Sequence, residues 1–174
     1  MKRIMAIAAT ALCLVLAATS AASASTAAGK SGTEVIAGST TDLSIIDANV
    51  TVLPVQAFGV VRTKGTIALS GPTNGTSSFD FRAGKLTVNH KQTSGGTQPT
   101  FNPKTCAASQ IQGGVYTVVG GTGKFYGAKG HGKFKLYFAA VFPRLKNGKC
   151  NTSPSAQPVS GKISFLAYGP LSVR

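Results

Sequence analysis

From residue 120 to residue 134 the chain reads Gly120-Gly121-Thr122-Gly123-Lys124-Phe125-Tyr126-Gly127-Ala128-Lys129-Gly130-His131-Gly132-Lys133-Phe134, with six glycines in fifteen positions. The stretch follows the run Val115–Val119, which is typical of a β-strand, and leads into a second alternating segment. Glycine is favoured where the backbone takes a positive φ or where two chains approach too closely for a Cβ. The stretch therefore predicts a tight turn between two neighbouring strands.

Glycine-rich loops also bind phosphates, but the spacing here does not fit the two common types. A P-loop needs a glycine five residues before the Gly-Lys pair, where this chain has Val118. The dinucleotide-binding pattern Gly-x-Gly-x-x-Gly fails because Tyr126 stands at its third glycine. No nucleotide and no other cofactor is predicted.

The segment Val118–Gly130, continuing to Phe142-Pro143, resembles a known family motif. It is similar to the Gly-Gly-Thr/Ser-Gly-x-Phe-x-Gly-x-x-Gly segment of the allene oxide cyclase and dirigent families and of their secreted bacterial relatives. The resemblance implies an all-β fold with a single eight-stranded antiparallel β-barrel of the calycin-like type. In those families the barrel interior hosts cyclisation of a fatty-acid epoxide or steers the coupling of phenoxy radicals. The acidic N-terminal segment of the cyclases and the aspartate and arginine placements of dirigent proteins find no match, so the resemblance carries the fold and not the activity.

The first residues are typical of a secretory signal peptide. Lys2 and Arg3 precede the apolar run Ile4–Ala18, and Ala22-Ser23-Ala24 offers the small residues that a signal peptidase reads. The run of about fifteen residues is shorter than the roughly twenty that span a bilayer, so no membrane span is predicted. The sequence therefore predicts a secreted, extracellular protein with a signal peptide at 1–24 and one β-barrel domain at 25–174.

The chain is strongly basic. Eighteen Lys and Arg stand against four Asp and Glu, which gives a formal net charge of +14, or +12 once Lys2 and Arg3 leave with the signal peptide. Such a charge favours anionic partners, for example an envelope polymer or an acidic polysaccharide. Nucleic acid is a less favoured partner, because tryptophan is absent and most phenylalanines are expected to point inward, away from the basic groups.

Two cysteines remain after removal of Cys13 with the signal peptide. In an exported protein an isolated pair predicts a disulfide between Cys106 and Cys150. A redox or metal-binding pair is the alternative, but neither cysteine belongs to a Cys-x-x-Cys motif.

Short apolar and alternating segments, separated by turn residues, predict an all-β domain. Turns are expected at Pro72-Thr73-Asn74-Gly75 and at Asn147-Gly148, and a long loop at Lys91–Thr105. The expected strands are Glu34–Ser39, Ser44–Val52, Ala57–Arg62, Gly65–Ser70, Ser77–His90, Ile111–Val119, Gly130–Phe142 and Val159–Tyr168.

The segment after Gly130 has a clear two-residue period. Its even positions Phe134, Leu136, Phe138 and Phe142 are apolar and predict an inward face, whereas its odd positions Lys129, His131, Lys133 and Lys135 predict a basic outward row. Lysines on an outer strand face also discourage pairing between edges, so a merely solvated row is one interpretation. The other is an anion-binding stripe.

The expected strand Ser77–His90 changes face midway. Phe79 and Phe81 are apolar at odd positions, whereas Leu86 and Val88 are apolar at even positions. One extra residue at Ala83-Gly84, as in a β-bulge, would produce this change. His90 would then point towards the barrel interior near its mouth, where it is either a structural histidine or a ligand contact.

Residues for catalysis are scarce. The two histidines and the acids Glu34, Asp42, Asp47 and Asp80 match no local hydrolase signature. They also do not supply the three close ligands of a zinc site, so no metal is predicted. The sequence therefore leans away from an enzyme, and His90 and Tyr116 are only weak catalytic candidates for an isomerase or cyclase.

The favoured function is the binding of a small apolar or aromatic molecule inside the barrel, without catalysis. Glycines at inward positions leave room for a ligand, and the expected lining residues are Phe134, Phe138, Ile163 and Phe165. Two alternatives stay open. One is an isomerase, cyclase or dirigent-type stereo-directing protein, and the other is a structural or surface protein that binds anionic envelope polymers through its basic face.

Overall fold

The computed structural model describes residues 29–42, 52–69, 74–96, 98–153 and 155–174, which form β-strands and a single turn of 3-10 helix. The signal peptide predicted at 1–24 lies outside the described residues. The strands are β1 (Lys30–Thr40), β2 (Val52–Phe58), β3 (Thr63–Ala68), β4 (Asn74–Phe81), β5 (Gly84–Ser94), β6 (Thr100–Asn102), β7 (Ala107–Gly121), β8 (Lys129–Val141) and β9 (Ser160–Val173).

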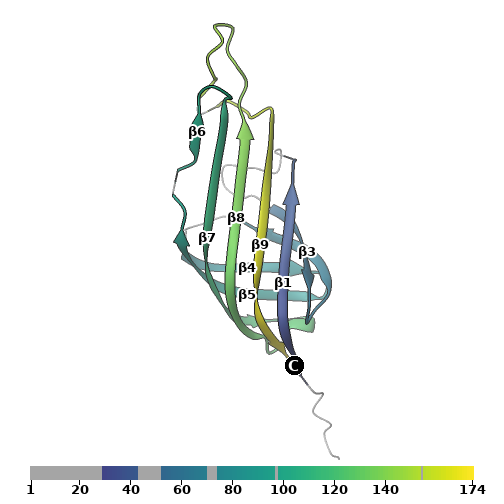
Figure 1. Ribbon diagram of the computed structural model, residues 1–174. Coiled ribbons are helices and arrows are strands. Elements are labelled where there is room, and N and C mark those ends of the chain that lie inside the picture. Colours follow the sequence, from purple (N-terminus) through teal and green to yellow (C-terminus); the bar gives the residue numbers. More distant parts are fainter. Residues whose placement is uncertain (1–28, 43–51, 70–73, 97, 154) are drawn as a thin grey trace, which may run out of the picture.

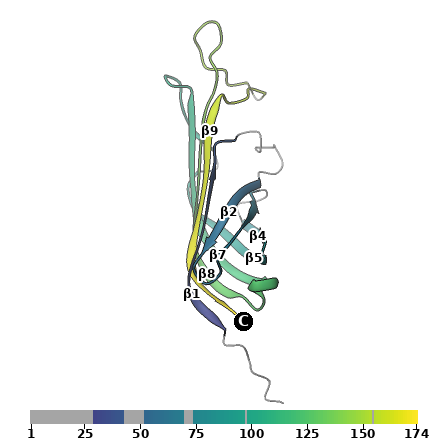
Figure 2. The same cartoon turned by 90° about the vertical axis from the view of Figure 1, so that its right-hand side faces the viewer.

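Eight of these strands close into an antiparallel β-barrel, which confirms the predicted fold class. Their order is β5-β4-β3-β2-β1-β9-β8-β7, and an additional pairing of β7 with β5 completes the ring. The ninth strand, β6, pairs with the other end of β7. β7, β8 and β9 are the longest strands, and they continue as a tall sheet beyond the barrel (Figures 1 and 2).

One end of the barrel is closed by the glycine-rich stretch from which the fold was predicted. The 3-10 helix η2 (Gly123–Phe125) lies in the connection between β7 and β8, at the end where the C-terminus lies (Figure 1). The Phe125 side chain is fully buried, with its ring centroid 5.2 Å from that of Phe81. The backbone N–H of Arg174 donates to the Tyr126 carbonyl. The stretch is therefore a turn between strands, as expected, and it also covers one end of the barrel.

The interior is packed with side chains that alternate along each strand with outward ones, as the two-residue period requires. On β8 the odd positions from Lys129 to Tyr137 are exposed and the even positions Phe134, Leu136 and Phe138 are partly buried against the core, so the predicted faces are confirmed there. Phe142, also predicted to point inward, lies beyond the end of the strand. The core is made of Ile36, Leu53, Val55, Ala57, Val61, Ile67, Phe79, Phe81, Leu86, Val88, Val118, Phe125, Ala128, Ile163, Phe165, Ala167, Leu171 and Val173.

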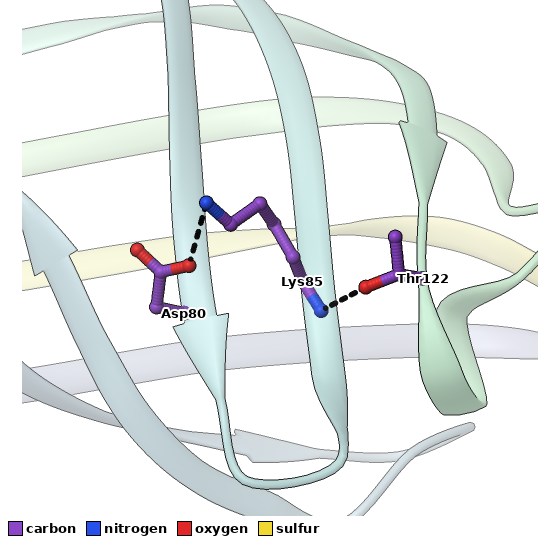
Figure 3. Close-up of polar contacts among 3 residues, drawn as sticks. All are labelled: Asp80, Lys85 and Thr122. Atoms are coloured by element: carbon purple, nitrogen blue, oxygen red, sulfur yellow. Dashed lines mark hydrogen bonds and ion pairs between the residues drawn. The ribbon is translucent and has the colours of Figure 1, made fainter.

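The predicted strand Ser77–His90 is wrong, because it is two strands. β4 and β5 form a hairpin that turns at Arg82-Ala83, and Phe81 pairs with Gly84. The apolar positions shift from odd to even numbers because the chain reverses direction at this turn, and not because of a bulge. Lys85 makes two contacts at the hairpin (Figure 3). Its Nζ lies 3.0 Å from a carboxylate oxygen of Asp80 on β4, and its backbone N–H donates to the hydroxyl of Thr122, which follows β7.

The region before β3 also differs from prediction. β2 runs through Pro54, whereas the predicted strand Ala57–Arg62 overlaps a bend at Gly59, which has a φ of +135°. β1 pairs with β2 only from Gln56 to Phe58, so Pro54 lies past that ladder and its missing N–H costs no bond to β1. Most of the predicted strand Ser44–Val52 and part of the predicted turn at Pro72–Gly75 lie outside the described residues.

The tall end of the sheet carries the disulfide. Cys106 and Cys150 are bonded, as predicted, and join the β6–β7 turn to the connection between β8 and β9. The Arg144 guanidinium donates to the carbonyls of Lys104 and Gly148 and so bridges the same two segments. The Asn147-Gly148 turn is confirmed, with a hydrogen bond from the Gly148 N–H to the Leu145 carbonyl. The predicted loop Lys91–Thr105 is only partly a loop, because it contains the end of β5 and all of β6.

Candidate functional site

The barrel contains a partly open cavity of about 320 Å³. Its wall is mainly apolar, with phenylalanine rings on three strands: Phe79 on β4, Phe134 on β8 and Phe165 on β9. The Phe165 ring centroid lies 5.8 Å from that of Phe79 and 6.5 Å from that of Phe134, so the three rings form one continuous surface. The remaining lining residues are Ile67, Ala68, Leu69, Ser77, Val88, His90, Gln92, Gln112, Tyr116, Leu136 and Ala167.

Polar groups of the cavity gather on β4, β5 and β7. The Ser77 hydroxyl lies 3.3 Å from Nδ1 of His90, and the His90 ring meets Phe134 edge to face. The side-chain amide of Gln92 donates hydrogen bonds to the backbone carbonyls of Ser94 and Gly95. The cavity thus combines an aromatic wall with a few polar side chains on one side, the usual composition of a site for a small organic molecule.

Two of the four predicted lining residues, Phe134 and Phe165, line the cavity. Phe138 and Ile163 do not. They face each other across β8 and β9, further from η2, where Ile163 is buried and Phe138 is partly buried against the core. The weak catalytic candidates His90 and Tyr116 are neighbours on the cavity wall, paired directly across β5 and β7. His90 therefore faces the barrel interior, although through the hairpin and not through a bulge.

A buried carboxyl group lies inside the barrel, which the sequence analysis did not place there. The side chain of Glu34, on β1, is only 3% exposed. Its Oε2 accepts a hydrogen bond of 2.9 Å from the Val61 backbone N–H, whereas its Oε1 has no hydrogen-bond partner among the described residues. The sequence contained one signal for the burial of Glu34, which is that it shares a strand face with Ile36, a buried residue. It was ambiguous because Val35 and Ala37, on the other face, are equally apolar.

Glycines separate Glu34 from Tyr116. Glu34 pairs with Gly169 on β9, and Tyr116 pairs with Gly132 on β8. A Cβ on Gly132 would lie 2.6 Å from the Tyr116 hydroxyl oxygen, so the phenol ring lies over this glycine. A Cβ on Gly169 would lie 2.7 Å from Cα of Gly132, so the two glycines are adjacent. Gly132 is one of the inward glycines that were expected to leave room for a ligand, but Tyr116 fills the space over it.

The two ionisable groups influence each other. Burial raises the pKa of the Glu34 carboxyl above its ordinary value of 4.5, and hydrogen bonds from the backbone of Val61 and Val60 only partly offset this rise. Burial also raises the pKa of Tyr116 to about 12, and the negative charge of Glu34 adds to the shift. The Tyr116 phenol is therefore neutral at physiological pH and can donate or accept a hydrogen bond in the cavity.

Glu34 should give the protein a pH-dependent stability. The folded protein takes up a proton on this carboxyl at a pH where the unfolded chain remains ionised, so the free energy of unfolding should rise as pH falls from the raised pKa towards 4.5. Glu34→Gln should remove this component, as measured by urea unfolding at several pH values. Asp80→Asn, a change at an exposed carboxylate, should retain it. An unchanged slope in the Glu34 variant would contradict this assignment.

Among the residues that the structure describes, no other acid forms a carboxylate pair with Glu34. Asp80 is exposed and paired with Lys85, Asp42 is exposed next to the end of β1, and Asp47 lies outside the described residues. Within the described part of the chain, no group of three or more His, Cys, Asp and Glu side chains could hold a metal ion. In that same part, no helix has the length and hydropathy needed to cross a membrane.

The predicted basic row Lys129, His131, Lys133 and Lys135 lies on the outside of β8, and all four side chains are exposed. It is therefore separate from the cavity, on the opposite face of the same strand. Comparisons with known proteins give no further assignment for either site: no family model matches the chain, and no curated protein and no solved structure matches it.

Proposed function

We propose that this protein is a secreted binding protein that holds a small apolar or aromatic molecule inside its β-barrel. The observation that carries the proposal is the aromatic-walled cavity of about 320 Å³ within the closed barrel. Cavities that bind small organic molecules begin at about 300 Å³, so the ligand is expected to be small. An eight-stranded barrel can either fill its interior with side chains or hold one ligand, and the cavity favours the second outcome.

The lining indicates how such a ligand would lie. Its apolar part would contact the rings of Phe79, Phe134 and Phe165, where burial of apolar surface contributes about 25 cal/mol per Å². A hydroxyl or carbonyl group on the ligand could reach the neutral Tyr116 phenol or the Ser77–His90 pair. The protein would thus recognise a mainly apolar molecule with one polar end.

Filling the cavity should block binding. Ala167, on the cavity wall, is buried, and Ala167→Leu would place its larger side chain in the space for the ligand. Affinity for the neutral fluorescent probe N-phenyl-1-naphthylamine should fall at least tenfold, since the lost contact area is worth more than about 1.4 kcal/mol. Ala167→Gly, which leaves the cavity open, should retain binding. Equal affinity of the leucine and wild-type proteins would contradict binding in this cavity.

A second candidate function is an isomerase or cyclase related to the allene oxide cyclase and dirigent barrels, in which the barrel confines a reactive intermediate. The unpartnered oxygen of buried Glu34, close to Tyr116, is the observation that favours it. Glu34 does not itself line the cavity, so it would act through Tyr116, which does. A bound molecule recovered chemically unchanged would favour binding alone, whereas conversion that Glu34→Gln abolishes would favour the enzyme.

A further inference from the structure

The outer surface of β7, β8 and β9 carries exposed apolar side chains as well as a row of basic ones. Lys129, His131, Lys133 and Lys135 run along the middle strand, about 7 Å apart. β7 and β9 flank β8 over most of its length (Figure 1). The side chains beside the lysines are therefore set by the strand register.

Exposed apolar side chains lie on both sides of the lysines. Lys133 pairs with Val115 on β7 and with Tyr168 on β9. Lys135 pairs with Leu166 on β9, and the next outward residue of β8, Tyr137, pairs with Ile111 on β7. These five apolar residues are between 38% and 62% exposed. We call this surface the outer face: Lys129, His131, Lys133, Lys135 and Tyr137 of β8, Ile111 and Val115 of β7, and Leu166 and Tyr168 of β9.

The apolar surface continues onto β1 and β2. Tyr168 pairs with Val35 on β1, and Val35 pairs in turn with Phe58 on β2, which is 44% exposed. A shallow groove of about 260 Å³ lies between Ile111, Lys135 and Leu166. Contiguous exposed apolar surface of this kind marks an interaction site with another molecule or with a membrane.

The outer face carries no negative charge in the described part of the chain. β7, β8 and β9 contain no Asp or Glu, Glu34 points into the barrel, and Asp80 is paired with Lys85 on the β4–β5 hairpin. The positive charge of the outer face therefore favours an anionic partner. A second copy of the chain does not fit this requirement, because symmetric pairing through the face would bring the two lysine rows together.

We propose that the outer face binds the surface of a membrane that contains anionic phospholipids, beyond the binding proposed for the cavity. The aliphatic side chains Ile111, Val115 and Leu166 favour a lipid over a glycan, because they can enter the region between headgroups and acyl chains. Tyrosines prefer this interfacial depth, and lysines reach back from it to lipid phosphates. Barrel and lipid surface would lie side by side, with the cavity on the other side of the β8 wall.

Vesicle sedimentation tests the proposal with the full chain that remains after export. Binding to phosphatidylcholine vesicles that contain phosphatidylglycerol is expected, together with much weaker binding to phosphatidylcholine alone. The triple variant Lys129→Gln, Lys133→Gln, Lys135→Gln should bind the anionic vesicles about 100-fold more weakly, given about 1 kcal/mol per lysine near such a surface. The matched control Lys64→Gln, Lys104→Gln, Lys146→Gln removes the same charge from exposed sites outside the outer face and should change binding less than threefold.

A second variant separates lipid insertion from simple attraction of charges. Leu166→Ser with Tyr168→Ser keeps every lysine and changes only exposed side chains, so the barrel should remain folded, which circular dichroism would check. Its vesicle affinity should fall about tenfold while its dependence on salt stays the same. Equal losses in the face and control lysine variants would overturn the proposal. So would binding to dextran sulfate without binding to vesicles, or a dimer in sedimentation velocity that the outer-face variants dissociate.

Discussion

Replacing Cys106 and Cys150 together by alanine is expected to lower the free energy of unfolding by about 4 kcal/mol. The disulfide closes a loop over a sequence separation of 44 residues, and most of its effect comes from restricting the unfolded chain. The bond also holds the β6–β7 turn against the connection that leaves β8, where the Phe142 N–H donates to the Cys106 carbonyl. Urea unfolding of wild-type and variant proteins measures the difference.

A reductant supplies the control for this prediction. Dithiothreitol should destabilise the wild-type protein by a similar amount and leave the double-alanine variant unchanged. The cavity lies within the barrel and neither cysteine lines it, so binding of N-phenyl-1-naphthylamine should survive in the variant at low denaturant. A wild-type protein that unfolds at the same urea concentration with and without reductant would show that the bond contributes little.

Gly84→Ala is expected to destabilise the barrel by about 2 to 6 kcal/mol. Gly84 has a φ of +135°, a conformation that costs other residues about 1 to 3 kcal/mol. A Cβ at this position would also collide with the backbone carbonyl of Thr122, which is held in place because the Thr122 N–H donates to the Lys85 carbonyl. Figure 3 shows how closely the hairpin and Thr122 approach. Relief of the collision would have to move the β4–β5 hairpin away from β7, at a further cost of about 1 to 3 kcal/mol.

Gly120→Ala is the matched control. Gly120 lies on β7 near the same end of the barrel, but a Cβ there would meet no atom within 4 Å, and its φ is not positive. This substitution should be neutral or should stabilise slightly, because alanine restricts the unfolded chain more than glycine does. Similar unfolding curves for the two variants would show that the contact with Thr122 does not constrain the hairpin.

The sequence predicted what depends on local pattern. The glycine-rich turn, the inward and outward faces of β8 and the cysteine pair could all be found, because each rests on spacing within one segment or on simple counting. The Arg82-Ala83 turn was missed because neither residue is a typical turn former and only Gly84 marks the site. β2 was missed because Pro54 normally interrupts a strand, and only the limited pairing with β1 explains its presence.

The candidate site was harder to predict because it depends on register between distant strands. Phe134 and Phe165 could be placed on inward faces, but which inward residues border a cavity depends on their height along the barrel. The position of Glu34 near Tyr116 follows from two ladders, β1 with β9 and β7 with β8, across adjacent glycines. No single segment of sequence contains that information.

Native mass spectrometry most directly tests whether the barrel holds a ligand. The protein would be purified from the culture medium of its own host and weighed before and after mild organic extraction. We predict an added mass of a few hundred daltons that extraction removes, in line with a cavity at the small end of ligand sites. The Ala167→Leu variant, produced in the same way, should lack that mass. A wild-type protein of bare chain mass, which also takes up no N-phenyl-1-naphthylamine, would contradict the proposed function.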